Sequence, residues 1–127
     1  MNSRRLLLAA TLAVLLAGCS AGSASDRAQK LADDATKAVY NDDMAGLTAN
    51  MNAALVPTIT RAQLGDLADK MHRLGDYQGV TLAGSDTLKS EYDFKAKFEK
   101  GTWTVILRLD GDGKIAAYRV APSSPGG

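Results

Sequence analysis

Apolar residues between positions 28 and 74 recur every three or four places, which is the spacing of one face of an α-helix. In the first segment these positions are Ala28, Leu31, Ala32, Ala35, Ala38 and Val39. Charged residues fill the opposite face, where Asp26–Lys30 and Asp33–Lys37 have the acid-first spacing of favourable helical ion pairs. Ser23 or Ser25 can cap the start of this helix. The pattern predicts an amphipathic first helix whose charged face is solvated and is not a binding site.

Two further helical segments follow the first. The run Asn41–Asp43 ends the first helix and caps a second one, which Pro57 ends. The apolar stripe of the second segment is Met44, Leu47, Met51 and Leu55. Thr60 and Gln63 have the spacing of a capping box for a third helix, and Gly75 is placed to cap its C-terminal end. The stripe of the third helix is Leu64, Leu67, Ala68, Met71 and Leu74.

From residue 88 the period changes to two, which is the pattern of half-buried β-strands. Lys100-Gly101 and Asp110–Gly113 are expected to form the turns between these strands. The expected strands are 80–83, 88–99, 102–109 and 114–120. Helices first and an antiparallel meander afterwards predict an α+β fold, in which the N-terminal helices cover one face of a sheet of about four strands.

The N-terminus has the pattern of a secretory signal peptide. Arg4 and Arg5 precede an uncharged apolar run of 12 residues, Leu6–Ala17, whereas a membrane-spanning helix needs roughly 20. The following Leu16–Cys19, Leu-Ala-Gly-Cys, resembles the bacterial lipobox. This resemblance implies a signal peptide over 1–18, cleavage between Gly18 and Cys19, and attachment of a diacylglyceryl group to the Cys19 sulfur. An ordinary signal peptide with an unrelated cysteine is the alternative.

A lipidated Cys19 predicts a membrane-anchored protein of the bacterial cell envelope. It is the only cysteine, so no internal disulfide is available to it. Because Ser20 differs from the aspartate that retains lipoproteins at the inner membrane, the periplasmic face of the outer membrane is favoured in a two-membrane host. The expected organisation is a flexible tether over 19–25, one domain over 26–120 and a disordered tail over 121–127.

The charge and the polar residues of the mature chain give little chemistry. Removal of two arginines lowers Lys plus Arg from 15 to 13, against 14 Asp plus Glu, so no basic field for nucleic acid is predicted. His72 is the only histidine and lacks the partners of a metal site. A calcium loop starting at Asp110 would have Lys114 at its fifth position and Ala121 at its twelfth. No metal and no cofactor are therefore predicted.

Several short stretches resemble a small family. They are Asn41–Asp43, Leu74–Tyr77 and above all Phe98–Pro122, FEKGTWTVILRLDGDGKIAAYRVAP. This order of elements is similar to domain of unknown function 3887 in the nuclear transport factor 2-like (cystatin-like) superfamily, although Ala117 stands where such domains often have glycine. The resemblance implies a curved sheet wrapped around helices with a conical cavity. It also implies a fold shared by enzymes such as ketosteroid isomerase and by proteins that only bind ligands or partners.

The inward-facing positions of the two long strands carry no charge, which argues against an enzyme with a catalytic acid or base. An enzyme would need His72 or a loop acid such as Asp76 to turn inward. A small apolar ligand could bind in a pocket, for which the candidate residues are Tyr92, Phe94, Trp103 and Val105. The same side chains could instead fill a solid core.

The outer face of the sheet offers a third possibility, because Thr102, Thr104 and Ile106 would suit contact with a protein partner or a second copy of the chain. The favoured prediction is a lipid-anchored, non-catalytic envelope domain that binds a partner or ligand. A pocket for a small molecule is the alternative, and an enzyme of the ketosteroid isomerase type is less favoured.

Overall fold

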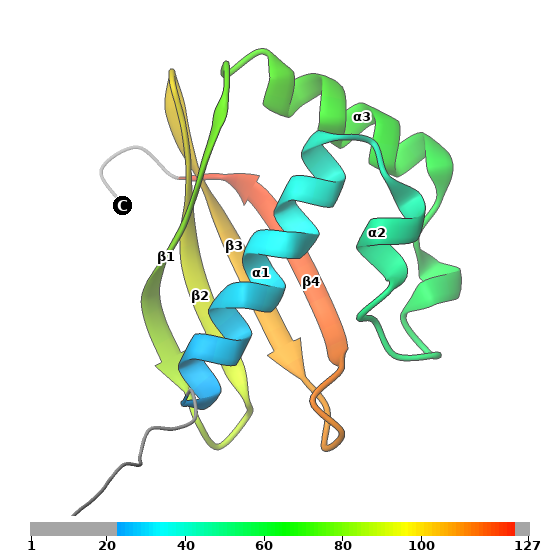
Figure 1. Cartoon of the computed structure of the whole chain (residues 1–127), viewed down its shortest axis with the longest axis vertical. Coiled ribbons are helices and arrows are strands. Elements are labelled where there is room, and N and C mark those ends of the chain that lie inside the picture. Colours follow the sequence, from blue (N-terminus) through cyan, green and yellow to red (C-terminus); the bar gives the residue numbers. More distant parts are fainter. Residues whose placement is uncertain (1–22, 124–127) are drawn as a thin grey trace, which may run out of the picture.

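The computed structural model describes residues 23–123 as helices followed by a four-stranded antiparallel sheet (Figure 1). The strands lie in the order β1-β2-β3-β4, so each is hydrogen-bonded to its neighbour in the sequence. This arrangement confirms the predicted α+β class. The elements are α1 (Ala24–Tyr40), α2 (Met44–Thr48), the 3-10 turn η1 (Val56–Thr58), α3 (Arg61–His72), β1 (Tyr77–Asp86), β2 (Glu91–Phe98), β3 (Gly101–Leu109) and β4 (Ile115–Pro122).

The long helix α1 lies across one face of the sheet and contacts β1, β2 and β3 (Figure 1). Its start is set by Ser23, whose side chain accepts a hydrogen bond from the backbone N–H of Asp26. The helix therefore includes Ala24 and Ser25, which the sequence placed in the tether. Its buried face consists mainly of small residues: Ala28, Ala32, Ala35, Thr36, Ala38 and Val39.

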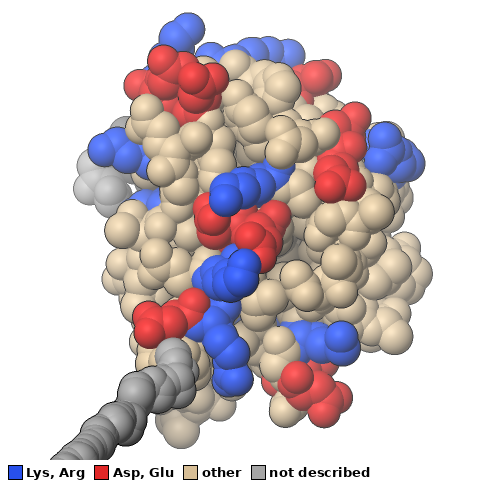
Figure 2. All heavy atoms as spheres, viewed as in Figure 1, with Lys and Arg blue, Asp and Glu red and all other residues tan. Residues whose placement is uncertain are grey.

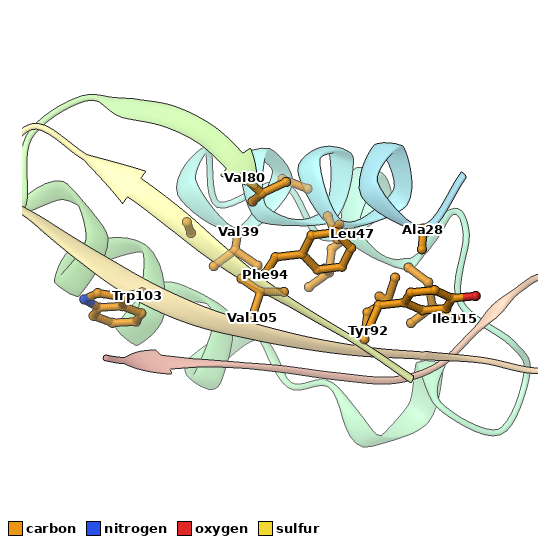
Figure 3. Close-up of a cluster of buried hydrophobic side chains, with 14 of the residues drawn as sticks. Ala28, Val39, Leu47, Val80, Tyr92, Phe94, Trp103, Val105 and Ile115 are labelled. Atoms are coloured by element: carbon orange, nitrogen blue, oxygen red, sulfur yellow. The ribbon is translucent and has the colours of Figure 1, made fainter. Parts of the chain in front are cut away.

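The small residues of α1 allow the aromatic side chains of the sheet to pack directly beneath the helix (Figure 3). Phe94 and Val105 are fully buried, and Tyr92 and Trp103 are almost so. They belong to one continuous apolar cluster that also contains Val39, Leu47, Leu64, Met71 and Ile115. Burial of such side chains stabilises the fold by about 1.5–3 kcal/mol each.

The exposed face of α1 carries charges of both signs, as Figure 2 shows. Lys37 pairs with Asp33 at 3.0 Å, as the sequence predicted. Lys30 pairs at 3.1 Å with Asp34, one turn later, rather than with Asp26, one turn earlier on the same side of the helix. The hydrogen bond and charge of Asp33 raise the pKa of Lys37.

The second helix is shorter than the sequence predicted. It ends at Thr48, and Met51 pairs with Ile115 in an isolated parallel bridge. The backbone N–H of Asn52 donates to the Ile115 carbonyl at 2.9 Å, and the Ile115 N–H donates to the Asn50 carbonyl at 2.8 Å. These hydrogen bonds to the start of β4 replace the ones that would have continued the helix.

The sheet also differs from the prediction in four respects. β1 has ten residues rather than four, and β2 begins at Glu91 because Asp86–Ser90 forms a turn that exposes Leu88. The hairpin turn between β2 and β3 is Glu99-Lys100, because Gly101 already pairs with Phe98. β4 continues to Pro122, opposite Trp103, and so enters the segment predicted to be a disordered tail.

Candidate functional site

A groove of about 630 Å³ lies between the η1–α3 segment and the edge strand β4. Its floor is formed by the ends of the first two helices, through Val39 and Leu47. The helical wall presents Leu55, Ile59, Gln63, Leu64, Asp66 and Leu67. The strand wall presents Thr104, Ile106, Tyr118, Arg119, Val120 and Ala121. The groove is therefore mostly apolar, with polar groups at its margins.

Local sequence features fix the helical wall. Thr60 accepts a hydrogen bond from the Gln63 N–H, and the Gln63 side chain accepts one from the Thr60 N–H, so the predicted capping box is confirmed. On the segment before it, the side-chain oxygen of Asn52 accepts the N–H of Leu55 at 2.9 Å. α3 itself packs against α1. The position of the helical wall is thus set by contacts within the helical layer.

The strand wall is the edge of the sheet itself. Side chains of consecutive strand residues point to opposite faces, yet residues 118–121 of β4 all line the groove. Thr104 and Ile106 lie on the face of the sheet opposite to the core residues Trp103 and Val105. The groove therefore follows the free edge of β4 and continues around it.

Along the described chain, β4 has a strand neighbour on one side, β3, and only the bridge at Ile115 on the other. An edge strand presents backbone N–H and C=O groups that can pair with another strand. The segment 50–52 uses this capacity at the start of β4. Further along β4, the groove lies beside the strand where a paired segment would otherwise be.

One polar pair links the strand wall of the groove to α1. The hydroxyl of Tyr118 lies 2.8 Å from the hydroxyl of Thr36, which is fully buried on α1. Burial raises the pKa of Tyr118 above its ordinary value. The phenol is therefore neutral at physiological pH, and its hydroxyl is engaged with Thr36 rather than left to act as an acid or base.

The four residues predicted to line a ligand pocket lie elsewhere. Tyr92, Phe94 and Val105 are buried in the core beneath α1, Trp103 is buried at the far end of the same core, and none of the four lines the groove (Figure 3). The alanine face of the helix lies so close to the sheet that these side chains fill the space between them. The solid-core alternative holds for this part of the molecule.

His72 and Asp76, which would have to turn inward in an enzyme, are both exposed. The Nε2–H of His72 donates to the carbonyl of Tyr40 at 2.7 Å, and the two rings lie 4.3 Å apart. His72 thus caps the last turn of α1 and joins the ends of two helices. The backbone N–H of Asp76, just before β1, donates to the Glu99 side chain at 2.7 Å, in the turn between β2 and β3.

The outer face of the sheet mixes small, polar and charged residues. Asp93 faces Ile106, which faces Arg119, and Lys95 faces Thr104 in the neighbouring row. The hydroxyl of Thr104 also contacts Ser123 at 3.0 Å. Thr102, Thr104 and Ile106 are on this face, as expected, and contact with a second copy through it stays a prediction.

Within residues 23–123, no group of three acidic, histidine or cysteine side chains could hold a metal ion. Asp110 instead closes a hairpin turn, and its Oδ1 accepts the N–H groups of Asp112 and Lys114. No helix of the described chain is long and apolar enough to cross a membrane. Gly18 and Cys19 lie outside the described residues.

Comparisons with family models, with curated proteins and with solved structures give no significant match. The resemblance to nuclear transport factor 2-like domains therefore stays a prediction. The assignment of the groove as the candidate site therefore depends on the geometry of the structure alone. Most of the groove residues on the helical side belong to apolar stripes that the sequence analysis identified. The pattern contained no signal that β4 would be separated from these residues by a groove.

Proposed function

We propose that this chain is a lipid-anchored, non-catalytic protein of the bacterial cell envelope whose groove binds an extended apolar segment of a partner protein. The observation that carries the proposal is the groove along the free edge of β4. The lipid anchor at Cys19 and the location at the periplasmic face of the outer membrane rest on the Leu16–Ser20 sequence.

The shape of the groove favours an extended segment. A strand added at a sheet edge gains main-chain hydrogen bonds, while its alternate side chains enter neighbouring pockets. The apolar walls, with Leu55, Ile59 and Leu67 facing Tyr118 and Val120, would receive such side chains. The segment 50–52 already pairs in parallel with Ile115, so an added strand would continue a path that the chain itself begins.

A small apolar molecule is the second candidate, and the volume of the groove favours it. Sites for such ligands commonly measure about 300–1,000 Å³, which includes the groove observed here. They also carry a few convergent polar groups that orient the ligand. In this groove Tyr118 is paired with Thr36, and Asp66 is paired with Lys70 at 2.8 Å. With Tyr118 and Asp66 engaged in this way, fewer polar groups are left to orient a small molecule.

A groove-filling variant tests the proposal. Leu67→Trp should fill the groove while leaving the core intact, and Thr81→Trp, on exposed β1, is the matched control. Displayed peptides with alternating apolar residues are selected on the acylated protein in nanodiscs. We expect the selected peptides to bind the wild type and Thr81→Trp alike, and to bind Leu67→Trp at least tenfold more weakly.

Hydrogen exchange then locates the bound peptide. Protection of backbone amides of β4 is expected, because the added strand would pair with them. Peptides that bind all three proteins equally, or that leave β4 unprotected, would contradict the proposal. Saturable binding of a fluorescent fatty acid to the wild type but not to Leu67→Trp, without peptide binding, would establish the small-molecule alternative.

A further inference from the structure

The most exposed large apolar side chain of the described residues lies at the tip of the first hairpin. Leu88 is 98% exposed, in the turn that joins β1 to β2. The carboxylate of Asp86 accepts the N–H of Leu88 at 3.1 Å, which fixes the backbone of the turn. Lys89 follows it. A single exposed leucine needs no explanation by itself, but the position of this one is informative.

The hairpin tip lies at the same end of the molecule as the start of α1 (Figure 1). Two contacts establish that α1 and β1 run in opposite directions. The Tyr77 hydroxyl donates to Asp33, whereas the Gln29 side chain donates to the Val80 carbonyl, so later strand residues meet earlier helix residues. The end of β1 therefore points the same way as the beginning of the helix.

The tip extends beyond the helix. From the Gln29–Val80 contact, the strand continues through residues 81–86, or about 20 Å at 3.3 Å per residue. The helix continues only through residues 24–28, or about 7.5 Å at 1.5 Å per residue. Because β1 is bulged between Leu82 and Gly84 and is inclined to the axis of α1, these lengths are upper limits, and the hairpin tip lies just past the first residue of α1 (Figure 1).

The chain between the proposed anchor and the domain is short. Cys19 precedes Ser23 by four residues, which span at most about 14 Å when fully extended. A tether of this length keeps the start of α1, and the hairpin tip at the same end of the molecule, close to the bilayer. With the lipid of Cys19 in the bilayer and α1 directed toward it, Leu88 arrives at the membrane surface.

We propose that Leu88 is a second membrane contact, which enters the headgroup region of the anchoring bilayer and orients the domain on it. This inference rests on the proposed lipid anchor at Cys19. Leu82, 39% exposed, is the nearest other large apolar side chain on β1 that is exposed. Glu91, Asp110 and Asp112 lie near the same end as Lys89 and Lys114, so the contact is apolar rather than electrostatic.

Fluorescence of a label at the tip tests this contact in the acylated protein. Acylation blocks the sulfur of Cys19, so Leu88→Cys provides the only free thiol for a polarity-sensitive dye. The control is Lys100→Cys, in the turn between β2 and β3 at the other end of the sheet. Both proteins are reconstituted in phosphatidylethanolamine vesicles with and without phosphatidylglycerol.

We expect the label at position 88 to shift to shorter wavelength and to be quenched by spin-labelled lipids in both membranes. The label at position 100 should keep its emission in water. Because the dye is itself apolar, a label at Thr87→Cys is compared with and without Leu88→Ser. The shift at 87 should be largely lost when Leu88 is replaced.

The outcomes separate the two proposals. A mature protein whose mass shows no lipid on Cys19, or a Cys19→Ser variant that stays in the membrane fraction, would overturn the anchor and this inference together. An acylated protein whose labels at 87 and 88 behave as the label at 100 would overturn the tip contact alone. A shift at 87 that is unchanged by Leu88→Ser would also overturn it.

Discussion

The two sides of the helical layer cover the same sheet in different ways. α1 presents alanines to β1, β2 and β3, so its backbone comes close enough for Tyr92 and Phe94 to fill the space beneath it. α3 and the segment around η1 present Leu67, Leu55 and Ile59 toward β4, yet a groove of about 630 Å³ separates them from the strand. The small residues of α1 allow close packing against β1, β2 and β3, whereas the larger residues of the η1–α3 segment face β4 across an open groove.

The difference shows that apolar content does not decide where a protein is open. Interiors are close-packed when side chains from both layers interdigitate. On the α1 side, large sheet residues enter the space left by small helix residues. On the β4 side, the wall is held by α1 and by the segment 50–52, so it need not contact the strand that it faces.

Truncation of one side chain on each side gives the largest expected contrast. Phe94→Ala removes a fully buried ring and should lower the free energy of unfolding by about 3–5 kcal/mol. Leu67→Ala removes a half-buried side chain on the groove wall, and we expect a loss of about 1 kcal/mol. Urea unfolding of both variants measures the contrast. Equal losses would show that the groove is closed in solution.

Much of the α1 side could be predicted from the sequence. The alternation of Tyr92, Phe94, Trp103 and Val105 identified the inner face of the sheet, and the spacing of the alanines identified the face of the helix that covers it. Whether these residues formed a pocket or a core could not be predicted, because this depends on how closely the helix approaches. The structure places them in the core.

Tertiary contacts explain what the sequence did not predict. The stripe through Met51 and Leu55 predicted a longer second helix, but residues 50–52 pair with Ile115 and the chain then turns into η1. The alternating pattern continues through Leu88 and Ser90 and therefore predicted a strand where the chain turns. The geometry of this turn depends on Asp86 and on a positive φ of 51° at Ser90. The groove depends on the separation between the η1–α3 segment and β4, and a local sequence pattern carries no information about that separation.

The polar pair between the two sides provides a smaller and more specific test. Thr36→Val keeps the shape of the side chain but leaves the Tyr118 hydroxyl without the partner that it has on α1. We expect a loss of about 1–2 kcal/mol in the free energy of unfolding. In a double-mutant cycle with Tyr118→Phe, the second change should cost much less than it does alone. Strict additivity would show that the two hydroxyls do not interact in solution.

The smallest expected effect concerns the contact between the β3–β4 turn and the segment before η1, where Asp110 accepts a hydrogen bond from Asn52 at 3.2 Å. Hydrogen bonds from the Lys114 backbone, and then from Asn52, lower the pKa of Asp110 below its ordinary value of 3.8. Its stabilising contribution is therefore present above pH 3.8 and is lost as the pH falls through the lower folded pKa.

Asp110→Asn should weaken the pH dependence of the unfolding midpoint below about pH 4. The control is Asp112→Asn, because the hydrogen bonds of the turn are accepted by the Asp110 side chain. Loss of hydrogen-exchange protection at Leu55 in Asp110→Asn alone would show that this contact holds the groove wall, and identical behaviour of the two variants would show that the wall is held by α3 and not by the turn.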